Sequence, residues 1–544
     1  MDNAQKFNEI IKKHEVFSIV KVEESSVMFK YQEKTCFTLI LYYENFDFNE
    51  MMPLIVANNF HEDFPHIMME SVKVKDKEYR SICLYEKEKF IFSDLSYVQK
   101  IEFLLERLEN LLKLSEIDQE KEFQKEFSHY WNASVSIKFA PHIFFTCNSE
   151  LRHLDYYLKN GIYRVLTKDK KLNDIDKWKK TKDKGFLIPI VNKDSILPPT
   201  KKAKWTVEDI LNILQNPQVN KIPSSVYDDL KKTKIKSRKI DLYFSLPFEN
   251  NRNLIFGCRL IYKNSGVKLF FDKLINDVVK IEPFFSFRED FNYLNQSIGN
   301  NTLEKKVAIV GCGSLGSYVA SEIIKSGIKD LVVIDEDIFS NENTFRHILP
   351  HYVKGMNKAL ALKYTLQHIH PEIVIESITK KLEEKDIDTI ISEKRVDVLI
   401  FCIGSTDEQR KLSKALISSG AECAILYSWL ESNGKDSRTI GIPKNSRGCF
   451  SCTKNEVESI FPSEEGYEKE YWISDGCGGT RVKYGNRTLL IATNGVLEAL
   501  DKVIFEDSPF VISSNIINGI NKKNLAISEC DICGNKTEKI QVAE

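Results

Sequence analysis

The chain has 544 residues, of which 42% are apolar and 28% charged, with a net charge of −1. At ~150 residues per domain this predicts three or four ordinary globular domains. The near-zero charge argues against a nucleic-acid-binding protein, and no apolar stretch reaches the roughly 18 residues of a membrane helix. The first residues lack the apolar core of a signal peptide, so we expect a cytoplasmic protein whose 12 cysteines stay reduced.

Residues 1–135 combine strands and helices, which predicts an α+β domain. A short helix is expected over 4–13, and leucines spaced three and four apart predict a long helix over 101–112. The strand-like runs are 17–22, 27–31, 36–43 and 81–92.

Residues 136–295 contain no recognisable group of catalytic or metal-binding residues, so we expect a connecting domain. The lysine- and aspartate-rich stretch 167–185 is expected to form solvated loops or helix faces. A helix is expected over 205–214, with Thr206 as N-cap and Asp209 three residues on, and strands over 240–245 and 253–262.

Residues 296–544 alternate strands and helices, which predicts an α/β domain with a parallel, Rossmann-like sheet. Its short buried strands are expected over 307–310, 331–334 and 396–403.

The run VAIVGCGSLGS places Gly311, Gly313 and Gly316 after a strand and before a helix. Glycines let the backbone approach phosphates, and the helix N-terminus supplies free N–H groups to an anion. Asp335 ends the next strand, where a carboxylate can accept hydrogen bonds from ribose hydroxyls. This motif alone fits NAD, FAD, S-adenosylmethionine or ATP.

Four residues farther along favour ATP: Asn343, Arg346, Lys358 and Asp407. An amide, a guanidinium and an ammonium suit a triphosphate, and a carboxylate after a strand suits Mg²⁺. The alternative is that Arg346 and Lys358 are surface charges and Asp407 is a helix cap.

In this order the motifs resemble the adenylating domain of the ThiF/MoeB and ubiquitin-activating-enzyme superfamily. The resemblance implies that Gly311, Gly313, Gly316 and the residues from Asp335 to Asp407 named above bind ATP and Mg²⁺, with Arg346 also catalytic. It implies adenylation of the C-terminal carboxylate of a protein. His347 departs from the family, many of whose members have Gln there.

Two CxxC pairs, Cys449 with Cys452 and Cys530 with Cys533, can supply the four thiolates of a closed structural Zn²⁺ site. A redox-active CxxC is the alternative. Cys477 stands apart between glycines on a predicted loop, near Arg481. It is expected to attack the acyl-adenylate and hold the acyl group as a thioester, or else to be a loop cysteine without a role.

Cys83 follows the N-terminal strands and precedes the long helix, an order that resembles a ubiquitin-conjugating domain. The resemblance implies that Cys83 accepts the acyl group from Cys477. The His-Pro-Asn tripeptide of eukaryotic conjugating domains is absent, and His66 is a candidate to assist. The alternative is a buried strand-core cysteine.

Together, domains 1–135, 136–295 and 296–544 resemble bacterial fusions of ubiquitin-conjugating-like and ubiquitin-activating-like domains, as in CBASS antiphage systems. This implies a homodimer that joins the C-terminus of a cGAS/DncV-like nucleotidyltransferase to a lysine or another amine. Two alternatives stay open: a sulfur-carrier adenylyltransferase of the ThiF/MoeB type, and an NAD-binding redox protein.

Overall fold

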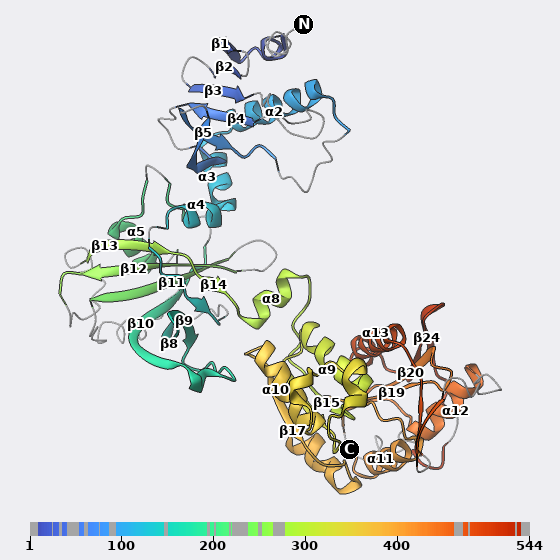
Figure 1. Cartoon of the computed structure of the whole chain (residues 1–544). Helices are drawn as coiled ribbons and strands as arrows, with labels where there is room; N and C mark the ends of the chain where they lie inside the picture. The colour runs from blue at the N-terminus through green and yellow to red at the C-terminus, as the bar shows by residue number, and fades with distance from the viewer. Residues whose placement is uncertain are drawn as a thin grey trace, which may run out of the picture. The chain divides into compact units, whose positions relative to one another are not determined.

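The computed structural model describes most of the chain as two units (Figure 1). One unit comprises residues 1–170 with 179–289, and the other 171–178 with 290–544. The described residues are 9–23, 26–31, 35–40, 54–58, 64–74, 77–85, 94–135, 137–145, 151–192, 196–200, 203–216, 219, 238–247, 253–264, 278–420, 422–461, 472–476, 479–527 and 530–534. No helix among them is long and apolar enough to cross a membrane.

The first unit begins with a six-stranded antiparallel sheet in the order β1-β2-β3-β4-β6-β5. Its strands are β1 (Phe17–Glu23), β2 (Ser26–Tyr31), β3 (Thr35–Ile40), β4 (Leu54–Asn58), β5 (Ile67–Val74) and β6 (Lys77–Ile82). Helices α2 (Tyr97–Leu112), α3 (Glu116–Lys125) and α4 (Phe127–Ala133) follow. Leu104, Leu105 and Leu108 of α2 are buried in the core of this sheet, as their spacing predicts. The expected strand over 81–92 is wrong in its described part, because β6 ends at Ile82 and residues 83–85 lie outside any strand.

A second, eight-stranded sheet has the order β13-β12-β11-β10-β8-β9-β7-β14. Its strands are β7 (His142–Ile143), β8 (Arg152–Lys159), β9 (Ile162–Thr167), β10 (Lys179–Pro189), β11 (Lys239–Pro247), β12 (Asn253–Tyr262), β13 (Val278–Phe284) and β14 (Phe287–Arg288). Helix α5 (Val207–Gln215) starts at the expected capping box of Thr206 and Asp209. The expectation of loops or helix faces over 167–185 is wrong at its C-terminal end, where β10 begins at Lys179.

The second unit is built on an eight-stranded sheet in the order β17-β16-β15-β18-β19-β20-β23-β24. Its first five strands are parallel: β17 (Val374–Ile378), β16 (Asp330–Ile334), β15 (Lys306–Val310), β18 (Val398–Phe401) and β19 (Ala424–Leu430). Antiparallel β20 (Asp436–Ile442), β23 (Phe510–Asn515) and β24 (Gly519–Asn524) extend it. Helices α8 (Phe291–Ser297), α9 (Ser314–Lys325), α10 (Lys358–Ile369), α11 (Thr406–Ser418), α12 (Phe450–Ile460) and α13 (Asn486–Val503) surround it, with β21 (Trp472–Gly476) paired to β22 (Gly479–Val482).

Hydrophobic cores cover both faces of this sheet, because successive side chains of a strand point to opposite faces. Val307 and Ile309 of β15 join one core with α9 and α13, which lie side by side (Figure 1). Ala308 and Val310 join the other core with α11 and α12. The predicted α/β, Rossmann-like domain with a parallel sheet is therefore confirmed.

Candidate functional site

The crevice at the carboxyl ends of β15 and β18 is the natural ligand site of this sheet. These strands are neighbours, yet the helix after β15 packs on one face and the helix after β18 on the other. Open α/β sheets bind ligands at this kind of topological switch point. The Gly311 N–H donates to the Ile334 carbonyl at 2.9 Å, and the Cys402 N–H donates to the Val310 carbonyl at 2.8 Å, so the loops that follow the strands are tied to the sheet.

Two glycines after β15, Gly311 in the loop and Gly316 in the first turn of α9, stand where no side chain fits. Gly311 has φ +89°, and a Cβ there would lie 2.8 Å from the Cys402 carbonyl oxygen. A Cβ on Gly316 would lie 1.9 Å from the Gly311 carbonyl oxygen. Gly313 caps α9 and faces open space, so its backbone is accessible to a ligand.

We expect Gly316→Ala to lower the free energy of unfolding by about 3 kcal/mol, because the new methyl group collides with backbone and not with a flexible side chain. Gly313→Ala is the matched control, expected to cost less than about 1 kcal/mol at an N-cap with free space. Urea unfolding of both variants measures the difference, and equal costs would contradict this packing.

Asp335 holds the glycine-rich loop in place. Its carboxylate accepts hydrogen bonds from the Cys312 N–H at 2.6 Å and the Asp337 N–H at 2.8 Å. Burial raises the pKa of Asp335, although these N–H groups favour the charged form. Asp335, which the sequence predicts to bind the ribose, therefore also holds the glycine-rich loop in place. The sequence did not reveal this second role.

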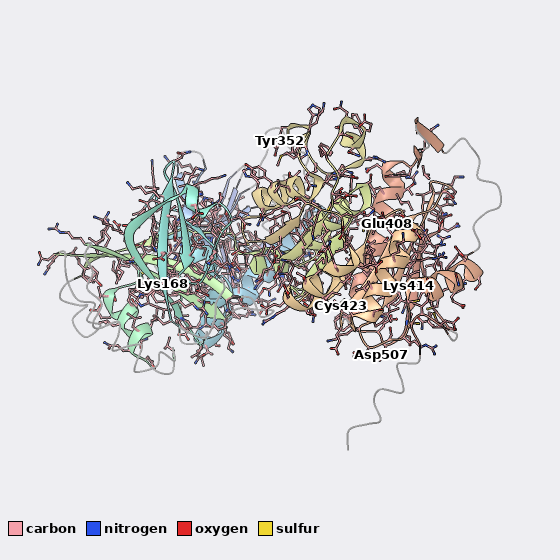
Figure 2. The ribbon with its side chains drawn as sticks, turned by 90° about the horizontal axis from the view of Figure 1, so that it is seen from below. Lys168, Tyr352, Glu408, Lys414, Cys423 and Asp507 are labelled. Carbon is pink, nitrogen blue, oxygen red and sulfur yellow. The ribbon has the colours of Figure 1, made fainter. Side chains whose placement is uncertain are left out.

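A cavity of about 730 Å³ opens beside this carboxylate. Gly311 and Asp335 line it together with Asp407 from the start of α11, the helix that carries the labelled Glu408 and Lys414 in Figure 2. Asp407 is largely exposed and pairs with Lys411 at 2.8 Å, which lowers the pKa of Asp407 and keeps it ionised. The structure thus brings three predicted site residues to one cavity.

Asn343 and Arg346 lie on the 3-10 helix η6 (Asn341–Arg346), after β16. The Asn343 side-chain oxygen accepts hydrogen bonds from the backbone and hydroxyl of Ser340, which caps η6. Arg346 differs, because its Nε is buried and has no hydrogen-bond partner among the residues that the structure describes. A buried, unpaired guanidinium N–H is costly, so this donor is suited to a ligand atom.

Lys358 begins α10 and is buried, with its ammonium 2.7 Å from the Asp337 carboxylate. The Lys358 N–H also donates to the Asp337 carbonyl at 2.8 Å. The lysine is therefore held beside the loop that contains Asp335, paired to the Asp337 carboxylate.

His347 joins the Arg346 segment to the glycine-rich loop. Its Nε2–H donates to the Cys312 carbonyl at 2.7 Å, and its Nδ1 accepts from the Leu349 N–H at 3.2 Å, so both nitrogens are used by a neutral ring. Burial, and then the charges of Lys358 and Arg346, lower the pKa of His347 to about 4, against the effect of its bond to Cys312.

Acidification should therefore destabilise the protein through His347. Because the folded-state pKa of about 4 lies below the ordinary 6.5, the unfolded chain binds the extra proton between these values, and stability falls as pH drops from 6.5 to 4. The loss reaches about 3 kcal/mol. We expect His347→Gln to lose less stability between pH 7 and pH 4.5 than the native chain in urea unfolding; identical losses would contradict this.

Sequence reasoning missed several residues of the cavity, among them Lys381, Leu382 and Ser405. Lys381 and Leu382 follow β17, and Ser405 follows β18. The signal was available in principle, because the carboxyl ends of neighbouring parallel strands converge on one crevice.

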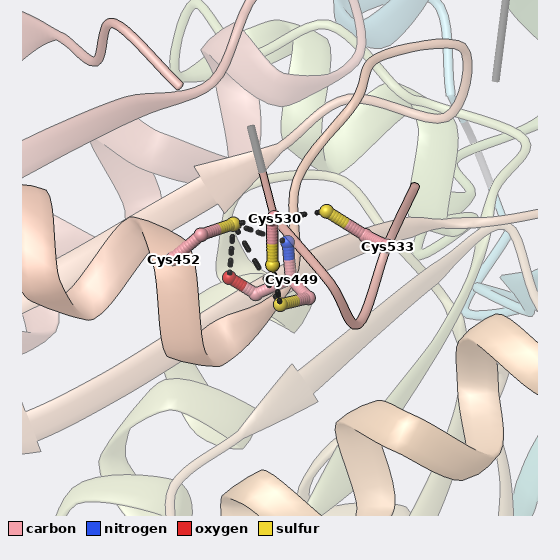
Figure 3. A group of neighbouring side chains, drawn as sticks. All are labelled: Cys449, Cys452, Cys530 and Cys533. Atoms are coloured by element: carbon pink, nitrogen blue, oxygen red, sulfur yellow. Dashed lines mark hydrogen bonds between the residues drawn. The ribbon is translucent and has the colours of Figure 1, made fainter. Parts of the chain in front are cut away.

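The four cysteines of the two CxxC pairs come together (Figure 3). Cys449 and Cys452 stand at the start of α12, and Cys530 and Cys533 lie in the turn after β24. The Cys449 Sγ is 3.6 Å from that of Cys452 and 3.8 Å from that of Cys530, and the Cys452 Sγ is 3.8 Å from that of Cys533. Zn–S bonds of ~2.3 Å in a tetrahedron separate the sulfurs by about 3.8 Å, so the donor set fits Zn²⁺.

Outside the four-cysteine cluster, Cys258, Cys312 and Cys423 are buried and Cys402 is partly buried. Cys83 is exposed and follows β6, so the alternative of a strand-core cysteine is wrong. Cys477 lies outside the described residues.

Comparison with known proteins identifies the second unit. Residues 294–503 match the model of the ThiF family. The chain is 25% identical to "ATP-dependent ubiquitin transferase-like protein Cap2" of Vibrio cholerae, over 44% of this chain and 43% of that protein. It is 26% identical to "Ubiquitin-like modifier-activating enzyme 5" of Bombyx mori, over 31% of this chain and 44% of that protein.

The matches span less than half the length of both relatives. Among solved structures, Escherichia coli MccB aligns with a TM-score of 0.33 and 20% identity, over 45% of this chain and 68% of that one. Residues 294–503 of this chain are a ThiF-family domain, the E1-like adenylating domain of that superfamily.

Proposed function

We propose that the chain adenylates the C-terminal carboxylate of a protein and passes the acyl group through cysteines to an amine. The observation that carries this proposal is the switch-point site of the ThiF-family domain, with the glycine-rich loop held by Asp335. Farther along the chain, the buried Arg346 Nε has no hydrogen-bond partner among the described residues. Such a donor set suits the negative charge that develops as pyrophosphate leaves ATP.

In the proposed site, the backbone around Gly311, Gly313 and Gly316 approaches the ATP phosphates, and Asp335 binds the ribose. Arg346 and Asn343 face the phosphates, while Lys358 exchanges Asp337 for a phosphate oxygen. Asp407 holds Mg²⁺, a role that its ionised, exposed carboxylate supports.

The proposed chemistry begins when a carboxylate oxygen attacks the α-phosphorus of ATP, and the bond to pyrophosphate breaks. The Cys477 thiolate then attacks the acyl carbon and AMP leaves. Cys83 takes the acyl group by thioester exchange, which its exposure permits. A lysine or another amine finally attacks the thioester and releases the Cys83 thiolate.

We further propose that residues 1–135 are the ubiquitin-conjugating-like domain, that 136–295 connect it to the adenylation domain of 296–544, and that Zn²⁺ on the four-cysteine cluster is structural. The similarity to Cap2, an "ATP-dependent ubiquitin transferase-like protein", supports ATP-dependent transfer chemistry. For this chemistry we propose a cytoplasmic antiphage role on a cGAS/DncV-like nucleotidyltransferase. Two highly exposed aromatic side chains, Phe345 at 98% and Tyr352 at 72% exposure, support a homodimer.

Intact mass spectrometry after incubation with ATP, Mg²⁺ and a cGAS/DncV-like nucleotidyltransferase tests the transfers. A thiol-sensitive adduct is expected on the native chain, and Cys477→Ala should remove it. An adduct that Cys477→Ala retains and Cys83→Ala removes would contradict the order of transfer. Product formation unaffected by Cys83→Ala would favour the sulfur-carrier alternative.

A further inference from the structure

His66 and Cys83 lie side by side in the first sheet. His66 directly precedes β5 and Cys83 directly follows β6, the strand paired with it, with Ile67 opposite Ile82. The Cys83 N–H donates to the His66 carbonyl at 2.8 Å. His66 has φ +66°, a conformation that non-glycine residues rarely adopt and that functional sites favour.

Two carboxylates from one helical segment hold the His66 ring. Nε2 lies 3.2 Å from the Glu122 carboxylate of α3, and Nδ1 lies 2.8 Å from the carboxylate of Glu126, the next residue after that helix. Neutral imidazole has one donor and one acceptor nitrogen, so acidic partners at both nitrogens favour the imidazolium. Although burial opposes the charge, hydrogen bonds with Cys83, Glu126 and Glu122 raise the pKa of His66 to about 10.

The cluster faces a cavity of about 520 Å³ that the Cys83 side chain also lines. The other charged groups on its wall are Arg107 of α2 and Lys125 of α3, and Lys125 pairs with Glu122 at 2.6 Å. Tyr85 lines it as well, and burial, followed by the charge of Cys83, raises the pKa of this phenol and keeps it neutral. With His66 charged, cations outnumber carboxylates around the thiol.

We propose that His66, clamped by Glu122 and Glu126, is a positioning residue that holds a fixed positive charge beside Cys83 and makes this exposed thiol a reactive acyl acceptor. A cation beside a cysteine favours the thiolate, which is the nucleophilic form. In the exchange, the Cys83 thiolate forms the new C–S bond as the bond to the donor sulfur breaks, and the donor departs as a thiolate. An imidazolium so held by its carboxylates acts as a charge and not as a general base.

The acyl transfer rests on the proposed function, but the activation of the thiol can be measured without ATP or a protein substrate. The experiment follows alkylation of Cys83 by iodoacetamide in the full-length chain between pH 6 and pH 10, with the Cys83 peptide quantified by mass spectrometry. We expect His66→Gln to slow alkylation at pH 7 about tenfold and to shift the pH profile upward. His66→Lys, which keeps a cation, should restore the rate to within about threefold of the native one.

Glu126→Gln keeps the side-chain shape and frees one ring nitrogen, so it should shift the alkylation profile in the same direction as His66→Gln. Glu120→Gln, on the exposed face of α3, is the matched control and should leave the profile unchanged. Identical profiles for the native chain, His66→Gln and Glu126→Gln would overturn the proposal. A shifted profile without any adduct on Cys83 would instead support the activation of the thiol and contradict the proposed acyl transfer.

Discussion

Replacing Arg346 with alanine is expected to slow ATP–pyrophosphate exchange by about 10²–10³-fold, the cost of removing one preorganised donor from developing phosphate charge. The Arg346 Nε is buried without a hydrogen-bond partner in the described part of the chain, so a ligand is the partner that would satisfy it. Exchange of labelled pyrophosphate into ATP measures the effect.

Lys363→Ala is the matched control, because Lys363 lies on α10 beyond the N-terminal turn that carries Lys358. It should exchange at the native rate. If Arg346→Ala exchanged pyrophosphate at the native rate, Arg346 would not belong to the site. The alternative, that Arg346 is a surface charge, would then be favoured.

Replacing Cys452 with serine is expected to reduce bound zinc from about one ion per chain to almost none and to lower the melting temperature by about 10 °C, the shift that ~3 kcal/mol causes in a domain of this size. The cluster joins the start of α12 to the turn after β24, so the loss of the metal would release two segments far apart in the sequence. Elemental analysis and calorimetry measure the two effects.

Cys423→Ala provides the control, because Cys423 (Figure 2) is buried in the same unit outside the four-cysteine cluster. It should keep its zinc. Equal zinc contents in native chain and Cys452→Ser would exclude the four-thiolate site.

The parallel sheet could be predicted because its strands are short, buried and apolar on both faces, a pattern that β15, β16 and β18 carry within a few residues each. Strand β10 could not, because its first half is lysine-rich and solvated and becomes buried only from Gly185. There the pairing with β8 holds the strand, with Lys180 2.6 Å from the Asp155 carboxylate. Because this strand pairing depends on residues outside β10, it leaves no pattern in the sequence of β10 itself.

The candidate site was predictable where it is local in sequence, as at the glycine-rich loop and Asp335. The bond from the Cys312 N–H to Asp335 and the presence of Lys381 in the cavity depend on which loops the sheet brings together. The same holds for His66, whose carboxylate partners are 56 or more residues away. Glu122 lies on α3 and Glu126 directly after it, so their meeting at the His66 ring also depends on the folded arrangement.

The central claim, adenylation of a protein C-terminus, is tested most directly by ATP–pyrophosphate exchange with the purified chain, Mg²⁺ and a cGAS/DncV-like nucleotidyltransferase. We expect exchange that requires the free C-terminal carboxylate and disappears when the last residues of that protein are removed or amidated. Absence of exchange with any protein tail, together with stoichiometric NAD binding, would contradict it.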